Sequence, residues 1–137
     1  MADLVRLADV EHLVTRYLAT ELGGVAHVGL IAPVGRDIVG HLPFVRVARR
    51  GGLADHLTRF DRPVLDIDIW HTTNQAVNSL GSLVRALMAA ARGLTDLDLG
   101  CSITSTTEVT GPQRLPEEDP SLVRLGFAVG LTVRSLV

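Results

Sequence analysis

The end of the chain alternates strictly between large apolar residues and small or charged ones, from Val123 to Arg134. Successive side chains of a strand point to opposite faces, so this pattern predicts one long strand. Its buried face consists of Val123, Leu125, Phe127, Val129, Leu131 and Val133, and its second face of Arg124, Gly126, Ala128, Gly130, Thr132 and Arg134. The small residues of the second face would let another backbone or subunit approach closely. We therefore expect this strand to serve assembly rather than catalysis.

Shorter alternating stretches predict further strands over residues 44–49, 63–70 and 97–109, and a weak edge strand within 25–32. Gly111 and Pro112 are strong breakers of regular structure, so they are expected to end the strand before them and to open a loop. That loop carries three acids and introduces the long final strand.

Apolar residues at three- and four-residue spacing predict two amphipathic helices, over 9–22 and 73–92. Asp9 is expected to cap the first helix. Thr72 or Thr73 is expected to cap the second, because Thr72 with Gln75 three residues later matches a capping box.

The order of these elements indicates an α+β fold. Strands that follow each other through single turns pair antiparallel, so we expect a mostly antiparallel sheet of about four to five strands with both helices packed on one face. A chain of 137 residues has the length of one domain, and residues 1–137 are expected to form it.

The composition excludes several classes of protein. With 47% hydrophobic and 20% charged residues the chain is too apolar to be disordered, yet no apolar run approaches the ~20 residues of a membrane span. The first residues include Asp3 and Asp9 and lack the basic start and apolar core of a signal peptide, so we expect an intracellular protein. A formal charge of −2 provides no basic footprint for sequence-specific nucleic-acid binding or for a membrane surface.

All thirteen basic residues are arginine. Arginine favours fixed, bidentate pairing of the kind found at interfaces, although codon usage in a G+C-rich genome explains the same bias. Arg46, Arg49 and Arg50 lie at the end of a predicted strand, where they could contact phosphate or an acidic neighbour.

Asp66 and Asp68 are the most suggestive candidates for chemistry. Two carboxylates two residues apart on a strand share a face and could bind Mg²⁺. A nuclease normally adds a third acid and a lysine, and the chain has no lysine, so a solvated or interface face is the better interpretation. The histidines include no pair four residues apart, and the single cysteine, Cys101, lies in no nucleophile motif. We predict no catalytic residue, no cofactor and no metal.

Several segments together resemble one known family. They are the capped first helix, Leu42-Pro43-Phe44-Val45-Arg46-Val47 with Arg50-Gly51-Gly52, the stretch from Asp61 to Trp70, the Ala/Leu-rich helix 73–92, and Gly111-Pro112, Leu115-Pro116 and Asp119-Pro120 ahead of the last strand. In this order they resemble the tail terminator proteins of long-tailed bacteriophages, especially those of actinobacterial hosts. The resemblance covers nearly the whole chain except 24–43.

The resemblance implies a non-enzymatic virion protein at the top of the tail, at the neck, assembled in the host cytoplasm. Subunits of this family form a homohexameric ring on the last ring of the tail tube, stop tube polymerisation and present a surface for head-tail joining. The implied partners are the subunit itself, the major tail tube protein and a head-completion or neck protein.

A ring needs heterologous contacts, in which one face of a subunit meets a different face of the next. The candidate residues for such subunit or tube contacts are Arg46, Arg49, Arg50, Asp66, Asp68, Arg124, Ala128 and Arg134. Two alternatives remain open at this point. One is a neck or head-closure adaptor of the same phage, and the other is a small Mg²⁺-dependent phage nuclease that uses Asp66 and Asp68.

Overall fold

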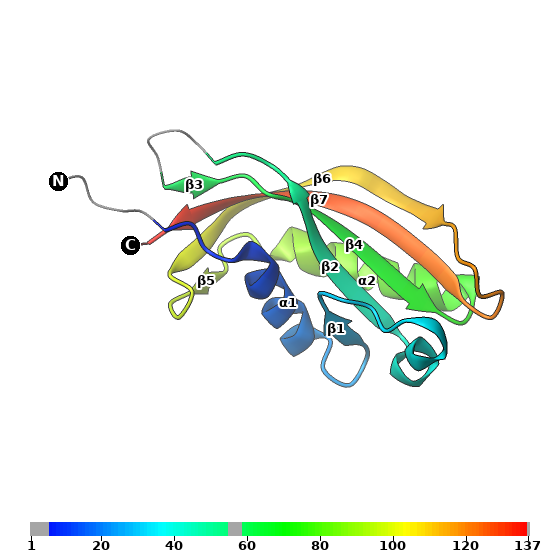
Figure 1. Ribbon diagram of the computed structural model, residues 1–137. Coiled ribbons are helices and arrows are strands. Elements are labelled where there is room, and N and C mark those ends of the chain that lie inside the picture. Colours follow the sequence, from blue (N-terminus) through cyan, green and yellow to red (C-terminus); the bar gives the residue numbers. More distant parts are fainter. Residues whose placement is uncertain (1–5, 55–58, 137) are drawn as a thin grey trace.

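A computed structural model of the chain describes residues 6–54 and 59–136. Its helices are α1 (Val10–Glu21) and α2 (Asn74–Ala90), together with a 3-10 helix, η1 (Gly35–His41). Its strands are β1 (His27–Gly29), β2 (Phe44–Gly51), β3 (Phe60–Asp61), β4 (Val64–His71), β5 (Thr95–Asp96), β6 (Cys101–Leu115) and β7 (Val123–Ser135). Figure 1 shows that the long strands form a curved sheet above the two α-helices.

The strands form one seven-stranded sheet in the order β1-β2-β4-β7-β6-β5, and β3 pairs with β7 outside this path. β1 and β2 are parallel, whereas the other pairs of described strands are antiparallel. The predicted α+β class and the mostly antiparallel sheet are thus confirmed, although the sheet has more strands than predicted. The additional strands, β3 and β5, are two residues long, too short to leave a periodic pattern in the sequence.

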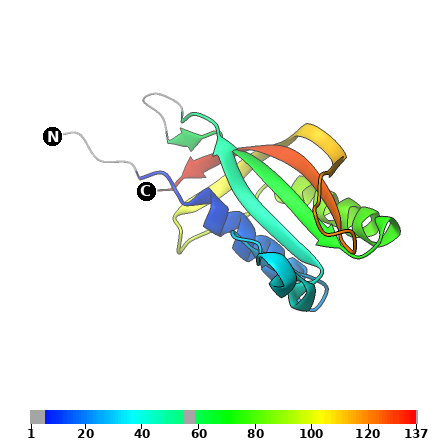
Figure 2. The same ribbon diagram turned by 45° about the vertical axis from the view of Figure 1, so that its right-hand side comes forward.

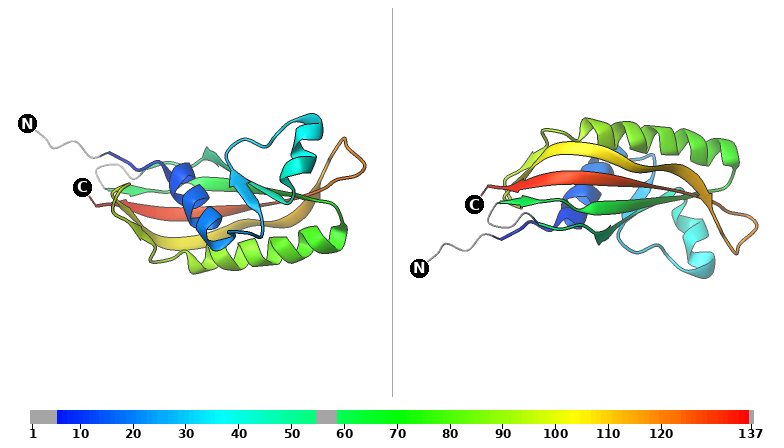
Figure 3. Two further views of the ribbon diagram at one scale, coloured as in Figure 1. Left: turned by 90° about the horizontal axis from the view of Figure 1, so that it is seen from below. Right: turned by 90° about the horizontal axis from the view of Figure 1, so that it is seen from above.

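Both α-helices lie on the same face of the sheet, as predicted, which is visible when Figure 2 is compared with the views from below and above in Figure 3. α1 packs against β1 and β2, and α2 packs against β4, β7 and β6. The core between the two layers contains Val14, Val47, Ile67, Val84 and Phe127. None of the helices in the described part of the chain is long and apolar enough to cross a membrane.

Both α-helices begin at side-chain caps. The Asp9 carboxylate accepts a hydrogen bond of 3.1 Å from the backbone N–H of His12, as predicted. Thr73 caps α2 by accepting a hydrogen bond from the Ala76 N–H, also at 3.1 Å. The predicted capping box of Thr72 and Gln75 is therefore wrong by one residue, since Thr72 lies outside the helix.

The predicted boundaries of the strand before the last loop are wrong. β6 begins at Cys101 rather than at residue 97, and it continues through Gly111 and Pro112 to Leu115. Its pairing with β7 shifts register between Thr110 and Gln113, which marks a bulge at the proline. Proline is tolerated there because, among the described strands, β6 is bordered on its other side only by the two-residue β5, which pairs with the start of β6 and does not require the missing N–H.

The segment 24–43 forms the edge of the sheet and a small second cluster. The weak edge strand predicted within 25–32 is present as β1, but η1 was not predicted. Ile38 of η1 packs with Phe44, Trp70 and Leu122. Phe44 and Trp70 alternate with core residues along β2 and β4, so this cluster lies on the sheet face opposite the α-helices.

Candidate interaction surface

The sheet face opposite the α-helices carries most of the charged residues predicted as contacts. Asp68 of β4 lies between arginines of the two neighbouring strands. Its Oδ2 atom accepts a hydrogen bond from Arg46 Nη2 on one side and a 3.0 Å hydrogen bond from Arg124 Nη2 on the other. The Asp68 side chain is only 6% exposed. Of the two interpretations of this face, solvated or interface, the solvated one is wrong for Asp68, because two long side chains from distant segments cover it.

Trp70 organises the same group of charges. The guanidinium carbons of Arg46 and Arg124 lie 5.5 Å and 5.0 Å from the centre of its ring, within the range of a cation–π interaction. The indole Nε1 donates a 2.9 Å hydrogen bond to Glu117 Oε2 in the loop before β7. We call Arg46, Asp68, Trp70, Glu117 and Arg124 the Trp70 cluster. It joins three strands and a loop, and its two arginines balance its two acids.

Sequence reasoning placed Asp66 and Asp68 on a shared face but missed the roles of Trp70 and Glu117. The available indications were the shared face of these strand residues and the acidic loop. Contact between the loop and Trp70 depends on how far β6 extends. That extent could not be predicted, because Gly111 and Pro112 were expected to end the strand. The cluster lies at a groove of about 750 Å³ between the segment 30–38 and the loop 116–122.

Two other predicted residues of this face pair with each other at the surface. Arg50 Nε lies 3.2 Å from Asp66 Oδ1, and both side chains are substantially exposed. Exposed pairs of this kind contribute little to stability. Their charges are therefore available to a partner at little cost to the fold.

Arg49 is held inside the subunit by a different acid. Its guanidinium donates hydrogen bonds of 2.7 Å and 2.9 Å to the buried Asp61, and its backbone N–H donates to Glu11 of α1. The hydrogen bond to Asp61 raises the pKa of Arg49 above its ordinary value. Arg49 therefore secures β2 to the rest of the fold.

The small residues of β7 are approached by side chains of the same chain. Ala128 is only 2% exposed. A Cβ atom on Gly126 would meet Leu115 of β6 and Asp68, and one on Gly130 would lie 3.3 Å from Val109 Cγ2. The close approach that the sequence indicated is thus made within the subunit at these positions. Arg134, in contrast, is exposed at the other end of β7, opposite Phe60 of β3.

Asp66 and Asp68 are poorly arranged for a divalent cation. Asp68 is already neutralised by two guanidinium groups and Asp66 by one, and a cation would have to compete with all three. Within residues 6–54 and 59–136, no group of three His, Cys, Asp or Glu side chains is positioned to hold a metal. Cys101 is fully buried, and burial raises the pKa of its thiol, which disfavours the nucleophilic thiolate.

Comparisons with known proteins address the whole fold. Residues 6–135 match the family model described as phage tail termination protein. A search of curated proteins finds no match. Among solved structures, a chain described as "Virion of native gene transfer agent (GTA) particle" is similar with a TM-score of 0.61 and 13% identity, covering 89% of this chain and 92% of that chain. At this identity the similarity concerns the fold. Because the family model spans nearly the whole chain, the protein belongs to the phage tail termination protein family, which is structural and not enzymatic.

Proposed function

We propose that this protein caps the tail tube as a homohexameric ring, ends tube polymerisation and provides the surface for head-tail joining. The observation that carries the proposal is the family match over residues 6–135. The protein acts at the neck of the virion and assembles there from the host cytoplasm. Its partners are its own copies, the major tail tube protein and a head-completion or neck protein. The family match favours this role over that of a head-closure adaptor.

The two layers of the subunit suit a cap. One face consists of helices, and the other is a sheet face that carries the Trp70 cluster and the surface pair Arg50 and Asp66. A protein that ends a polymer must bind the last ring with one surface and present an unlike surface on the other side, so that no further tube subunit adds. Two chemically different faces meet that requirement.

The predicted contact residues divide into three groups within this proposal. Arg50, Asp66 and Arg134 are accessible and contact the neighbouring subunit or the tube directly. Arg46 and Arg124 are partly accessible and contribute charge from the Trp70 cluster. Asp68 and Ala128 are buried, and Arg49, although partly accessible, is bound to Asp61; these residues hold the strands that carry the others.

The experiment is deletion of the gene in the phage followed by electron microscopy of the lysate. The proposal expects tails of uncontrolled length without heads, and normal particles when the gene is supplied in trans. Supply of an Arg50→Glu variant, which keeps the core intact, should restore fewer particles than supply of the wild type. Tails of normal length, joined to heads in the absence of the protein, would contradict the proposal.

A further inference from the structure

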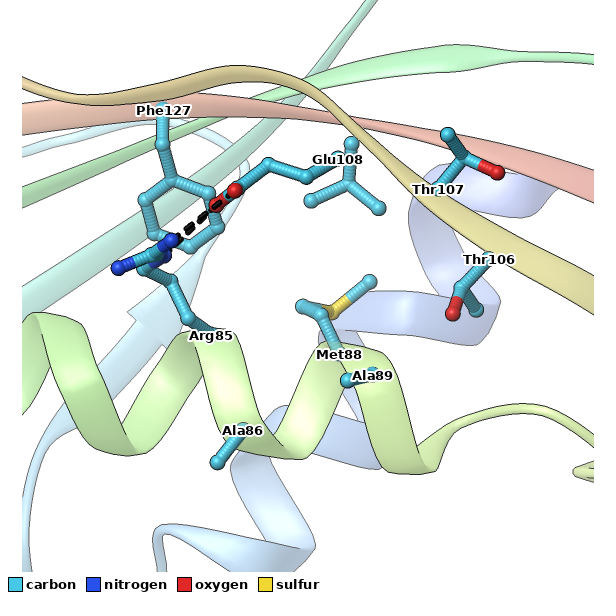
Figure 4. Close-up of a pocket in the computed structure, with 9 residues that line it drawn as sticks. Arg85, Ala86, Met88, Ala89, Thr106, Thr107, Glu108 and Phe127 are labelled. Carbon is cyan, nitrogen blue, oxygen red and sulfur yellow. Dashed lines mark hydrogen bonds and ion pairs between the residues drawn. The ribbon is translucent and has the colours of Figure 1, made fainter.

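An apolar hollow lies between α2 and β6, at one edge of the sheet. It has a volume of about 300 Å³ and is lined by Met88, Ala89, Thr106, Phe127 and Val129, among others. Figure 4 shows Met88 and Ala89 on the helix below it and Phe127 descending from the sheet above. Core residues can therefore be reached from the surface through the hollow.

An ion pair joins α2 to β6 at the border of the hollow. Arg85 Nε and Nη2 donate hydrogen bonds of 2.6 Å and 2.9 Å to the two carboxylate oxygens of Glu108 (Figure 4). Both side chains are about two-fifths exposed. An apolar floor with a charged, accessible rim is the usual anatomy of a pocket that receives an apolar side chain from a protein partner.

The opposite edge of the sheet carries an exposed apolar segment, which also lines the groove at the Trp70 cluster. It is the segment 30–34, which follows β1, and we call it the knob. Ile31 is 86% exposed and Val34 is 83% exposed, and Leu30 beside them is also exposed. Large apolar residues gathered in one exposed segment indicate an interaction site. Asp37, at the start of η1 next to the knob, is exposed as well.

The order of the strands relates these two features. β1 and the knob are at one end of the order, whereas β6 follows β7 towards the other end. In both views of Figure 3, η1 lies along one side of the sheet and α2 along the other. A heterologous ring contact joins unlike surfaces on opposite sides of a subunit, and the knob and the hollow occupy such positions.

We propose that the knob of one subunit inserts into the hollow of the next subunit around the ring. This inference rests on the proposed function and names the contact that closes the ring. The occupant is a second copy of this chain because the knob supplies apolar side chains for the apolar floor. Asp37 beside the knob also brings a carboxylate to the rim, where it can accept a hydrogen bond from Arg85 Nη1, since Glu108 binds Nε and Nη2. A chain with both halves of one contact can propagate it from subunit to subunit.

Site-directed crosslinking in purified virions tests the contact. In an Ile31→Cys/Ala89→Cys double variant both positions are exposed, and the native Cys101 is fully buried and does not compete. Treatment with a short bismaleimide should give a ladder of covalent oligomers of this chain. A Leu97→Cys/Ala89→Cys variant is the matched control, because Leu97 is 82% exposed but lies outside the knob. It should give at least about tenfold less oligomer.

Two other outcomes of the crosslinking experiment would contradict the proposed contact. Crosslinks of Ala89→Cys only to a tail tube or neck protein would show that another occupant fills the hollow. No oligomer in virions that contain the protein would show that the hollow and the knob do not meet.

A second arm separates this contact from the proposed function. Ile31→Asp should stay folded, because its side chain is exposed, yet fail to restore normal tails, whereas Leu97→Asp should restore them. Normal tails with Ile31→Asp would refute the contact and leave the capping function intact. Absence of the protein from virions would refute the function and the contact together.

Discussion

The carboxylate of Asp68 occupies the space where a side chain of Gly126 would be. The two residues are direct partners on β4 and β7, and a Cβ atom on Gly126 would lie 2.9 Å from Asp68 Oδ1. The Cδ1 atom of Leu115 on β6 comes closer still to the same position, so the glycine accommodates both side chains. The glycine therefore makes room for the acid that holds Arg46 and Arg124, and its place in the alternating pattern reflects that internal requirement.

Gly126→Ala should destabilise the subunit. The added methyl group displaces Leu115 and Asp68 from their positions, and overpacking of this kind costs about 1–3 kcal/mol. The measurement is chemical denaturation followed by circular dichroism. Gly111→Ala is the control, because a Cβ atom there meets nothing within 4 Å, and its midpoint should be unchanged. Equal midpoints for both variants would show that Leu115 and Asp68 move aside freely.

Asp68→Asn should be more damaging than Asp66→Asn. The first change removes the negative charge between two partly buried guanidinium groups, which should cost about 2–3 kcal/mol, somewhat less than for fully buried pairs. The second weakens one exposed pair and should cost less than about 1 kcal/mol. Comparison of the two unfolding free energies at neutral pH tests the assignment. If Asp66→Asn is the more destabilising, the cluster does not have the structural role described.

The strand periodicity of the sequence was sufficient to predict which faces of β4 and β7 are apolar, and Asp9 correctly marked the start of α1. The environment of Asp68 could not be predicted, because its partners Arg46 and Arg124 are far away in the sequence. Sequence alternation assigns a residue to a face, but it does not show what covers that face. The same limit explains why the small residues of β7 left open whether another backbone or a subunit approaches them, whereas side chains of β6 in the same chain approach Gly126 and Gly130.

The prediction of where β6 ends is wrong for a local reason. Gly111 and Pro112 normally end a strand, but here a bulge and an almost unpaired edge accommodate them. Whether a strand lacks a hydrogen-bonding neighbour on one side is decided by the assembled sheet and cannot be read from the local sequence. The hollow beside α2 could not be predicted either. The sequence predicts that α2 is a helix and that β6 is a strand, but it does not give the distance between them.

Phe127→Ala should strongly destabilise the subunit. Phe127 lies in the core between the two layers, and truncation of a buried phenylalanine typically costs about 3–5 kcal/mol. Leu53→Ala, at an exposed position, should change stability by less than about 0.5 kcal/mol. Thermal and chemical denaturation give both values. An unchanged midpoint for Phe127→Ala would mean that the faces of β7 are reversed.

The contribution of Glu108 to stability should disappear in acid. Its hydrogen bonds from Arg85 lower its pKa in the folded state. A lowered folded-state pKa stabilises the fold above the unfolded pKa, and the effect is lost as the pH falls through the folded pKa. The wild type should therefore melt slightly above Glu108→Gln at about pH 6, and the difference should be smaller at about pH 3, below the ordinary glutamate pKa.

The control for this prediction is Glu118→Gln, which changes an exposed glutamate outside the hollow. It should melt like the wild type at both pH values. A Glu108→Gln variant whose difference from the wild type persists in acid would show that the side chain acts by packing rather than by its charge.

The central claim, that this protein is the cap of the tail, is tested most directly by electron cryomicroscopy of the head-tail junction of the virion. The account predicts one ring of density on the last ring of the tail tube into which this subunit fits, with its helix face and its sheet face in different surroundings. Density for this subunit repeated along the tube, or absent from the junction, would contradict it.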